Sequence, residues 1–508
     1  MGRTSVFLLL LLSCGAFAQN QSPPKQGDGT QSSQTQAAQT QDVQQMQDQI
    51  RRLQQETEEL KARLAAVEKS KSGKPQVVNA TASAGDKAPG RENERPPEAT
   101  IAVASPGSTS PTSRPQDAPP QPPPPEEKVD KPEMEIYGFA MLDLGYDFGQ
   151  INPNWFDVER PTQLPAFKNE FGQNGRLFAG VRQTRFGVKN LFPTPVGQLK
   201  TVFEFELFGV GIDAGQTTFR LRHAYGELGQ LLAGQTWSPF MDPDVFPNSI
   251  EYWGPNGMVF FRNVQLRWQP IHNGNKQVMI ALERPGATAD LGTVQDRDIL
   301  QGVQFRFPAP DISGHVRWGG KRTYIQLSGI FRYIAWDDNA PTTITNLTGH
   351  TYGWGAHVSS NVGVGEKDTI KWSVIYGDGV ENYMNDAPVD IGPKARLFDL
   401  QRPLTGEPLP VFGAVAFYDH YWNEKFSSTI GSSVVNITNT PLLPPETFRR
   451  GWYGVTNLLY YPMKNVMLGG EFIWGRRENF TDGFIFDDYR IQFSFRYNFS
   501  HKLLGGNK

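Results

Sequence analysis

Apolar and polar residues alternate along the last part of the chain. From Tyr489 to Phe499 every second side chain is aromatic or aliphatic, and the residues between them are polar or charged. Successive side chains of a β-strand point to opposite faces, so this segment has one apolar and one polar face. Such a strand fits the wall of a membrane barrel, where lipid covers the apolar face and a water-filled lumen covers the polar one.

The same alternation recurs from Glu133 onward and predicts an all-β transmembrane barrel of about sixteen antiparallel strands. The expected barrel occupies residues 133–499, and residues 500–508 form a C-terminal tail. The expected strands are Glu135–Phe148, Arg176–Asn190, Gln198–Phe208, Phe219–Leu228, Gln230–Trp237, Val259–Gln269, Gln277–Arg284, Ile312–Trp318, Tyr324–Ile334, Tyr352–Asn361, Thr369–Tyr376, Val411–Trp422, Phe426–Ile437, Trp452–Tyr461, Val466–Arg476 and Asp487–Phe499.

The lengths of the expected connections favour a barrel over a sandwich. The links after even-numbered strands are short, such as Gly319–Thr323, and most links after odd-numbered strands are long, such as Gly377–Pro410. A transmembrane barrel has short periplasmic turns and longer extracellular loops, whereas a sandwich has no reason to sort its loops in this way. The barrel must close on itself, because open strand edges are not tolerated in hydrocarbon.

The N-terminus predicts export. Arg3 supplies a basic first region, Val6–Leu12 an apolar core, and residues 16–18 a cleavage site, so residues 1–18 are an expected signal peptide. The only cysteine, Cys14, lies inside it. The alternative is a lipoprotein signal that would place a lipid on Cys14, and the intact mass of the mature chain distinguishes the two.

Three segments are expected between the signal and the barrel. Residues 19–42 are rich in Gln, Ser and Thr and predict disorder, and residues 69–132 are a Pro/Ala/Ser-rich linker that ends in a polyproline II spacer. Residues 43–68 follow a strict heptad, which favours a periplasmic α-helical coiled coil of two or three parallel chains over a lone amphipathic helix. Its seam residues are Val43, Met46, Ile50, Leu53, Thr57, Leu60, Leu64 and Val67.

The composition excludes several other classes of protein. The mean hydropathy is −0.47 and no run of ~20 apolar residues follows the N-terminus, which excludes a helical membrane protein. The net charge of −3 gives no sign of nucleic-acid binding. The chain lacks the motifs of common hydrolases, phosphate-binding loops and cysteine-based metal sites, so we expect neither an enzyme nor a bound cofactor or metal.

Arginines fall on the polar faces of several expected strands, where they would line the lumen. Rings of Arg or Lys are a common device for anion selectivity, and arginine binds carboxylates and phosphates through paired hydrogen bonds. An alternative is that these arginines pair with Glu204, Glu206 or Glu471 and neutralise a packed interior. The candidates for the basic wall are Arg185, Arg220, Arg222 and Arg490.

The segment Ser238–Met258 combines several aromatic residues with the acids Asp242, Asp244 and Glu251. A segment this aromatic would not stay exposed to water. We expect it to fold into the barrel and narrow it, with its acids facing the lumen arginines across a gap. The alternative is an outer cap or a clasp between subunits.

Two of the expected strands, Gln230–Trp237 and Val259–Gln269, alternate poorly. A strand whose outer face meets lipid needs an apolar residue at every second position. A strand that contacts another protein does not, so a subunit interface at this part of the wall is a further hypothesis.

A series of short motifs runs in order through the first strands of the expected barrel. They occupy residues 137–148, 154–162, 182–187, 233–238, 240–244, 251–255 and 262–265. This order resembles the DcaP-like outer-membrane porin family. The resemblance implies a trimer of 16-stranded barrels with an N-terminal periplasmic coiled coil, passing small anions such as dicarboxylates. One departure is the end of the chain, because such barrels usually end on an aromatic residue, which here would be Phe499.

We therefore expect an outer-membrane diffusion porin that prefers small anions such as (di)carboxylates. It would sit in lipid and lipopolysaccharide as a homotrimer, with its N-terminal segment in the periplasm. A phosphate-type anion porin is one alternative. Another is a barrel-anchored scaffold or adhesin that tethers a periplasmic or cell-wall partner, and deletion of residues 19–131 distinguishes it, because a porin would keep its channel.

Overall fold

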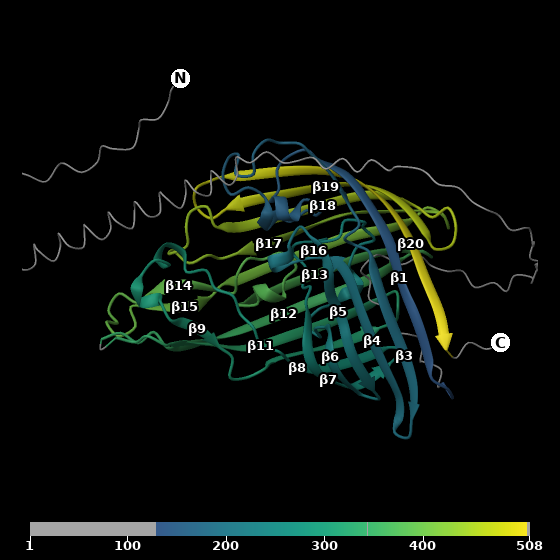
Figure 1. Cartoon of the computed structure of the whole chain (residues 1–508), viewed down its shortest axis with the longest axis horizontal. Coiled ribbons are helices and arrows are strands. Elements are labelled where there is room, and N and C mark those ends of the chain that lie inside the picture. The colour runs from purple at the N-terminus through teal and green to yellow at the C-terminus, as the bar shows by residue number, and fades with distance from the viewer. Residues whose placement is uncertain (1–128, 343, 505–508) are drawn as a thin grey trace, which may run out of the picture. The chain divides into compact units, whose positions relative to one another are not determined.

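The computed structural model describes residues 129–342 and 344–504. Its main element is an antiparallel sheet that closes on itself, because β1 (Glu133–Asp147) pairs with both β3 (Arg185–Thr194) and β20 (Ile485–Leu504) (Figure 1). The expected signal peptide, disordered segment and coiled coil, and nearly all of the linker, lie outside the described residues.

The remaining strands of the sheet follow one another around the wall in chain order. They are β2 (Arg176–Gly180), β4 (Gly197–Phe208), β5 (Thr217–Leu228), β6 (Leu231–Trp237), β7 (Arg262–Asn273), β8 (Lys276–Glu283), β9 (Val303–Arg306), β10 (Asp311–Gly319), β11 (Tyr324–Asp338), β12 (Gly349–Val364), β13 (Asp368–Asp378), β16 (Pro410–Tyr421), β17 (Phe426–Ile437), β18 (Phe448–Tyr460) and β19 (Val466–Asn479). Both β2 and β3 pair with β1, and both β9 and β10 pair with β11, so each couple forms one interrupted strand. The eighteen strands of the sheet thus make the predicted barrel of sixteen antiparallel strands.

The predicted alternation of faces is confirmed. Along β20 the side chains of Arg490, Gln492 and Arg496 are buried, whereas those of Phe493 and Phe495 are exposed on the outer surface. No helix in the described part of the chain is long and apolar enough to cross a membrane.

The sorting of connections by length is also confirmed. Turns such as the one between β7 and β8 join strands at one end of the barrel, and long connections join them at the other. One long link, predicted as a loop over Gly377–Pro410, contains a further hairpin of β14 (Ile391–Ala395) and β15 (Leu404–Pro408). In Figure 1 this hairpin lies beside β9, at the end of the barrel opposite the C-terminus.

Several strand boundaries differ from the prediction, and three of the differences change the course of the wall. The single strand expected over Arg176–Asn190 is interrupted at residues 181–184, and β7 begins at Arg262 instead of Val259. The last strand continues beyond Phe499 to Leu504, because the first residues of β1 provide pairing partners for it, such as Tyr137 for Ser500. Residues 500–504 of the expected tail are therefore part of the wall.

Arg182 lies at the interruption between β2 and β3 and is almost completely buried. Its guanidinium donates to the backbone oxygens of Gly209 (2.9 Å) and Gln216 (3.1 Å) and pairs with Asp157 at 2.5 Å. Within the described residues β2 pairs only with β1. The other edge of β2, which faces β4, therefore has no backbone ladder. The arginine supplies hydrogen bonds that the missing ladder would have made.

Replacing Arg182 with alanine is expected to destabilise the barrel by about 3–5 kcal/mol, because it leaves Asp157 as an unpaired buried carboxylate. Denaturant unfolding of the refolded barrel, followed by tryptophan fluorescence, measures the change. Arg306→Ala is the matched control, since Arg306 pairs with Asp337 on the surface and its loss costs less than about 1 kcal/mol. Equal unfolding midpoints for the two variants would contradict the structural role given to Arg182.

Candidate functional site

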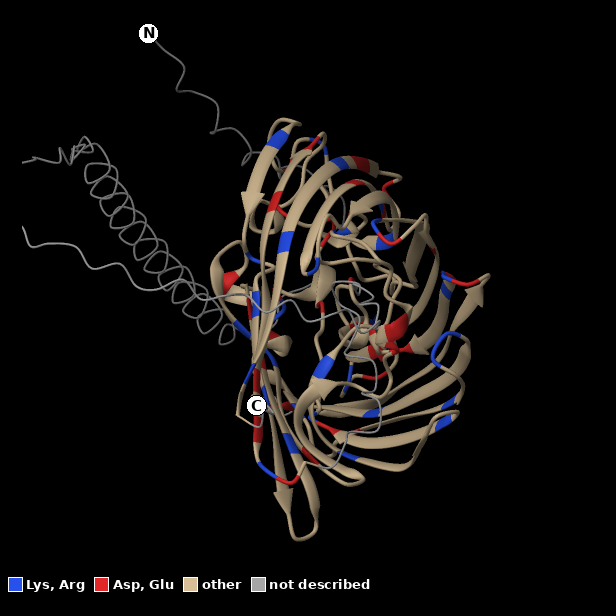
Figure 2. Ribbon diagram, turned by 90° about the vertical axis from the view of Figure 1, so that its right-hand side faces the viewer, with Lys and Arg blue, Asp and Glu red and all other residues tan. Residues whose placement is uncertain are grey.

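The connection Ser238–Met258 between β6 and β7 is mostly buried and lies against inward-facing residues of distant strands. Lys371 on β13 donates to the backbone oxygen of Phe246 at 2.6 Å, and Asn457 on β18 donates to that of Asn248 at 2.8 Å. Figure 2 views the barrel from one end and shows segments between strands inside the ring, with acidic and basic positions among them. The segment is thus held by the far wall through its backbone.

The acids at the start of this segment pair with an arginine that the sequence analysis did not select. Arg317 on β10 lies 2.6 Å from Asp242 and 2.5 Å from Asp244. Asp242 also accepts hydrogen bonds from the hydroxyls of Tyr324 (2.8 Å) and Ser359 (2.6 Å). Burial opposes its charge, but Arg317 and the two hydroxyls together hold the pKa of Asp242 below its ordinary value.

The variant Asp242→Asn is expected to loosen the segment, because an amide removes the charge that Arg317 neutralises and two of the acceptor positions. Arg317 keeps Asp244 as a partner, so the cost is that of lost hydrogen bonds to a charged group, about 1.5–3 kcal/mol, and it lowers the local free energy of opening the segment by that amount. Hydrogen exchange of residues 240–246 in the folded barrel should rise accordingly. Asp399→Asn, at the exposed tip of the β14–β15 hairpin, should leave that exchange unchanged.

Glu251 stabilises the turn in which it lies and has no arginine partner among the described ion pairs. Its carboxylate accepts backbone N–H groups of Glu159 (3.0 Å), Trp253 (2.9 Å) and Gly254 (2.5 Å). Burial raises the pKa of this carboxyl group despite these hydrogen bonds. The expectation that all three acids of the segment face the four candidate arginines across a gap is therefore wrong: two acids pair with Arg317 and the third binds backbone.

Three of the four candidate arginines lie together around two buried glutamates of β4. Arg222 is 2.8 Å from Glu204 and 2.5 Å from Glu206, and Arg185 is 3.7 Å and 3.5 Å from the same carboxylates. Arg220 approaches Glu206 at 3.6 Å. These three arginines thus pair with Glu204 and Glu206, as the alternative interpretation of the sequence expected.

A further arginine, Arg262 at the start of β7, completes this cluster and was not selected from the sequence. It lies 3.8 Å from Glu206, and its guanidinium sits over the ring of Trp237 at 4.8 Å. Tyr252 of the inserted segment donates a hydrogen bond to Glu206. We call Arg185, Arg220, Arg222, Arg262, Glu204 and Glu206 the arginine cluster; in it four arginines surround two glutamates.

Arg490 does not belong to this cluster. It pairs with Asp147 on β1 at 2.8 Å and lies 4.0 Å from Glu159. Glu471, the third acid considered as an arginine partner, instead accepts the backbone N–H groups of Ile250 (3.0 Å) and Glu251 (2.9 Å). The structure therefore separates Arg490 from the other three candidates and assigns Glu471 to anchoring the inserted segment.

A second set of contacts ties other connections to the same segment. Arg160 lies between the rings of Trp155 and Trp253, 4.1 Å and 4.0 Å from their centroids, and pairs with Asp386 at 2.9 Å. The connections after β1, β6 and β13 thus meet at one arginine. In residues 129–342 and 344–504 no group of three or more His, Cys, Asp or Glu is arranged to hold a metal ion.

The comparison with protein families agrees with this architecture. A family model described as DcaP outer membrane protein matches residues 125–499. The chain belongs to the DcaP family. It is therefore an outer-membrane β-barrel protein of a family whose members include the solved outer membrane channel DcaP. The resemblance found in the sequence motifs is confirmed.

A solved structure has the same fold as this DcaP-family protein. The outer membrane channel DcaP of Acinetobacter baumannii aligns with a TM-score of 0.61 and 18% identity, over 73% of this chain and 99% of that one. A more distant likeness is OmpT of Vibrio cholerae, with a TM-score of 0.44 and 12% identity over 73% of this chain and 100% of that one. The search of curated proteins gave no match.

Proposed function

We propose that this DcaP-family protein is a diffusion porin that passes small hydrophilic solutes with a preference for anions such as (di)carboxylates. The observation that carries the proposal is the arginine cluster beside the inserted segment, with four guanidinium groups around two carboxylates. An anion that passes beside the guanidinium groups of Arg220 and Arg262 is attracted by them, whereas a cation is repelled.

The donors of the cluster support a carboxylate or phosphate ligand in particular. Nη1 of Arg262 is buried without a hydrogen-bond partner among the described residues, and the side chain of Arg220 is 27% exposed. Glu206, which is fully buried, fixes the orientation of the arginines in advance. Planar guanidinium groups held in this way offer paired N–H donors that match the two oxygens of a carboxylate.

We further propose that Ser238–Met258 narrows the lumen. Support comes from its burial and from its anchors on opposite parts of the wall, since Asp242 binds Arg317 on β10 and the backbone of Ile250 binds Glu471 on β19. A segment fixed at both places leaves less cross-section for solutes than an empty barrel of this size. Its Tyr252 contacts Glu206, so the narrow region and the arginine cluster are at the same height.

The proposal extends to the rest of the chain. Residues 1–18 act as a signal peptide, the heptad at residues 43–68 forms a coiled coil in the periplasm, and the protein assembles as a homotrimer in lipid and lipopolysaccharide. The strict heptad supports self-association of parallel chains, which orients all barrels in the same direction.

Planar-bilayer recordings of the full-length mature protein test the proposed function. Under a KCl gradient, the reversal potential is expected to have the sign of a chloride-preferring channel, and millimolar succinate should reduce the chloride current by competing for the cluster. A reversal potential of the cation-preferring sign would refute the anion preference, and an absence of channels would refute the porin.

A further inference from the structure

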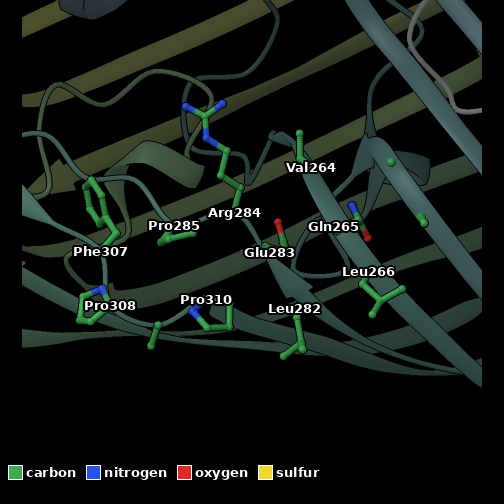
Figure 3. A pocket seen from close by; sticks show the side chains of 13 residues that line it. Val264, Gln265, Leu266, Leu282, Glu283, Arg284, Pro285, Phe307, Pro308 and Pro310 are labelled. Carbon is green, nitrogen blue, oxygen red and sulfur yellow. The ribbon is translucent and has the colours of Figure 1, made fainter.

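The outer face of the wall is apolar on most of its strands. Figure 3 shows this for β7 and β8, where the side chains of Leu266 and Leu282 project from the strands. One polar cluster departs from this pattern. It consists of Asp368 at the start of β13 and of Tyr418 and His420 near the end of β16. Polar side chains on this face call for an explanation, because hydrocarbon offers them no hydrogen bonds.

The polar cluster lies on the outer face at the periplasmic end of the barrel. Phe417 and Asp419 are buried, so the alternation along β16 puts Tyr418 and His420 on the outer face. Asp368 follows the short turn after β12, and His420 lies just before the short turn that leads to β17. Short turns lie on the periplasmic side of an outer-membrane barrel. The cluster is therefore level with the headgroups of the periplasmic leaflet.

Hydrogen bonds fix the orientation of the imidazole in this cluster. Nδ1 of His420 lies 2.8 Å from Oδ2 of Asp368, and the hydroxyl of Tyr418 donates to the same oxygen at 2.5 Å. The backbone N–H of Tyr421 donates to Oδ1 of Asp368 at 3.0 Å. An ionised carboxylate only accepts hydrogen bonds, so Nδ1 carries the hydrogen. In the neutral ring Nε2 then keeps a lone pair, and no group in the described part of the chain donates to it.

An indole ring stands beside this imidazole. Trp422 follows β16, and its ring meets that of His420 edge to face, with the centroids 4.3 Å apart. Its Nε1 donates to the hydroxyl of Ser428, the register partner of His420 on β17, at 3.0 Å. Trp422 is held by this bond but stays 64% exposed, so part of the indole is open to a ligand. A carboxylate, a nitrogen lone pair and an aromatic ring thus lie together, and such groups attract an ammonium ion.

We propose that Asp368, His420 and Trp422 bind the ammonium group of a phospholipid that has an ethanolamine headgroup. A primary ammonium has three N–H donors, and the available acceptors are Nε2 of His420 and the carboxylate of Asp368. The π face of the indole attracts the positive charge in addition. A glycerol headgroup offers no cation, and a choline headgroup has no N–H to donate. The site therefore selects among phospholipids by the chemistry of the headgroup.

The surface next to the site favours a lipid over a soluble amine. One step towards the middle of the membrane, the register partners of Tyr418 are Ile370 on β13 and Ile430 on β17. Both side chains are exposed on the outer face and offer apolar contact to acyl chains. Solutes in the lumen do not reach this face, so the inference goes beyond the proposed channel function and does not depend on its ion preference.

Native mass spectrometry of the full-length mature protein tests the proposed site. The protein is released from micelles that contain equal amounts of phosphatidylethanolamine, phosphatidylcholine and phosphatidylglycerol, and the lipids that stay bound are identified. Phosphatidylethanolamine should be retained most. His420→Phe and Asp368→Asn should each lower its retention about tenfold, which corresponds to one hydrogen bond to a charged group. Equal retention of the three lipids by the parent protein would overturn the proposal.

The matched control is His350→Phe. His350 also lies on the outer face, but at the other end of the wall, where its ring stacks on that of Tyr333 with the centroids 5.2 Å apart. This variant should retain phosphatidylethanolamine as the parent does. If it loses the lipid to the same extent as His420→Phe, the effect is not local to the site and the proposal fails.

Trp422→Leu tests the site even if neither polar variant folds, because Trp422 lies in an exposed turn. Loss of the aromatic ring should lower retention of phosphatidylethanolamine about threefold. Soluble phosphoethanolamine in equal amount should not displace the lipid, and displacement would show that the site binds an amine and not a lipid. The variants should keep the parent's conductance and ion preference, so a failed lipid test leaves the proposed porin standing, and a cation-preferring parent leaves this site standing.

Discussion

Replacing residues 239–260 with a two-residue turn should raise the single-channel conductance at least about twofold, because ionic current scales with the cross-section that the inserted segment occupies. The change is feasible because the backbone N–H of Ser238 donates to the oxygen of Phe261 at 3.0 Å across the ends of the deletion, and the next pair, Trp237 and Arg262, are register partners on neighbouring strands. A tight hairpin can therefore join β6 to β7 with the ladder between them intact. Recordings in planar bilayers, compared at equal salt, measure the effect.

The control for this deletion is the same operation at a place far from the lumen. Ala395 and Leu404 are also register partners, so residues 396–403 at the exposed tip of the β14–β15 hairpin can be replaced by the same turn. That variant should conduct like the parent. If the deletion of residues 239–260 gives a folded barrel, judged by its heat-dependent mobility on gels, with the parent's conductance, the segment does not narrow the pore.

The strands of the barrel could be predicted from the sequence because each strand meets two unlike media. Lipid on one face and water on the other impose a period of two that any single strand reveals, as Phe493 and Gln492 on β20 illustrate. The interruption at Arg182 could not be predicted, because it depends on carbonyl groups of Gly209 and Gln216 that only the folded chain brings near.

The charged interior was predicted in part for the same reason. Alternation placed Arg185, Arg220, Arg222 and Arg490 on inner faces, but it carries no information about which acid each one meets. Arg317 follows the alternation of Ile312–Trp318 and was open to the same argument. Arg262 was not, since it lies where β7 begins after the inserted segment and its strand alternates poorly. Partners of inward-facing charges depend on how the inserted segment folds, which is a tertiary property.

The double variant Arg220→Glu with Arg262→Glu should invert the ion preference. It changes the arginine cluster from four positive and two negative groups to two positive and four negative ones. A unit charge at ~5 Å changes the energy of a monovalent ion by about 1–3 kcal/mol for an effective dielectric between those of water and of a protein surface. Since 1.4 kcal/mol is a factor of about ten, the chloride-to-potassium permeability ratio should fall by at least about tenfold, and the reversal potential in a KCl gradient should change sign.

Two further variants make this result interpretable. Arg220→Gln with Arg262→Gln removes two positive charges without crowding acids around the buried Glu206, so it should fold even if the double glutamate variant does not. It should abolish the preference without inverting it. Arg306→Glu lowers the charge by two units, as the double glutamine variant does, but at an exposed position beside Asp337. It should leave the reversal potential near the parent value. If the glutamine variant retains the parent's chloride preference, ion selectivity arises elsewhere in the lumen, and the arginine cluster serves only to neutralise Glu204 and Glu206 within the wall.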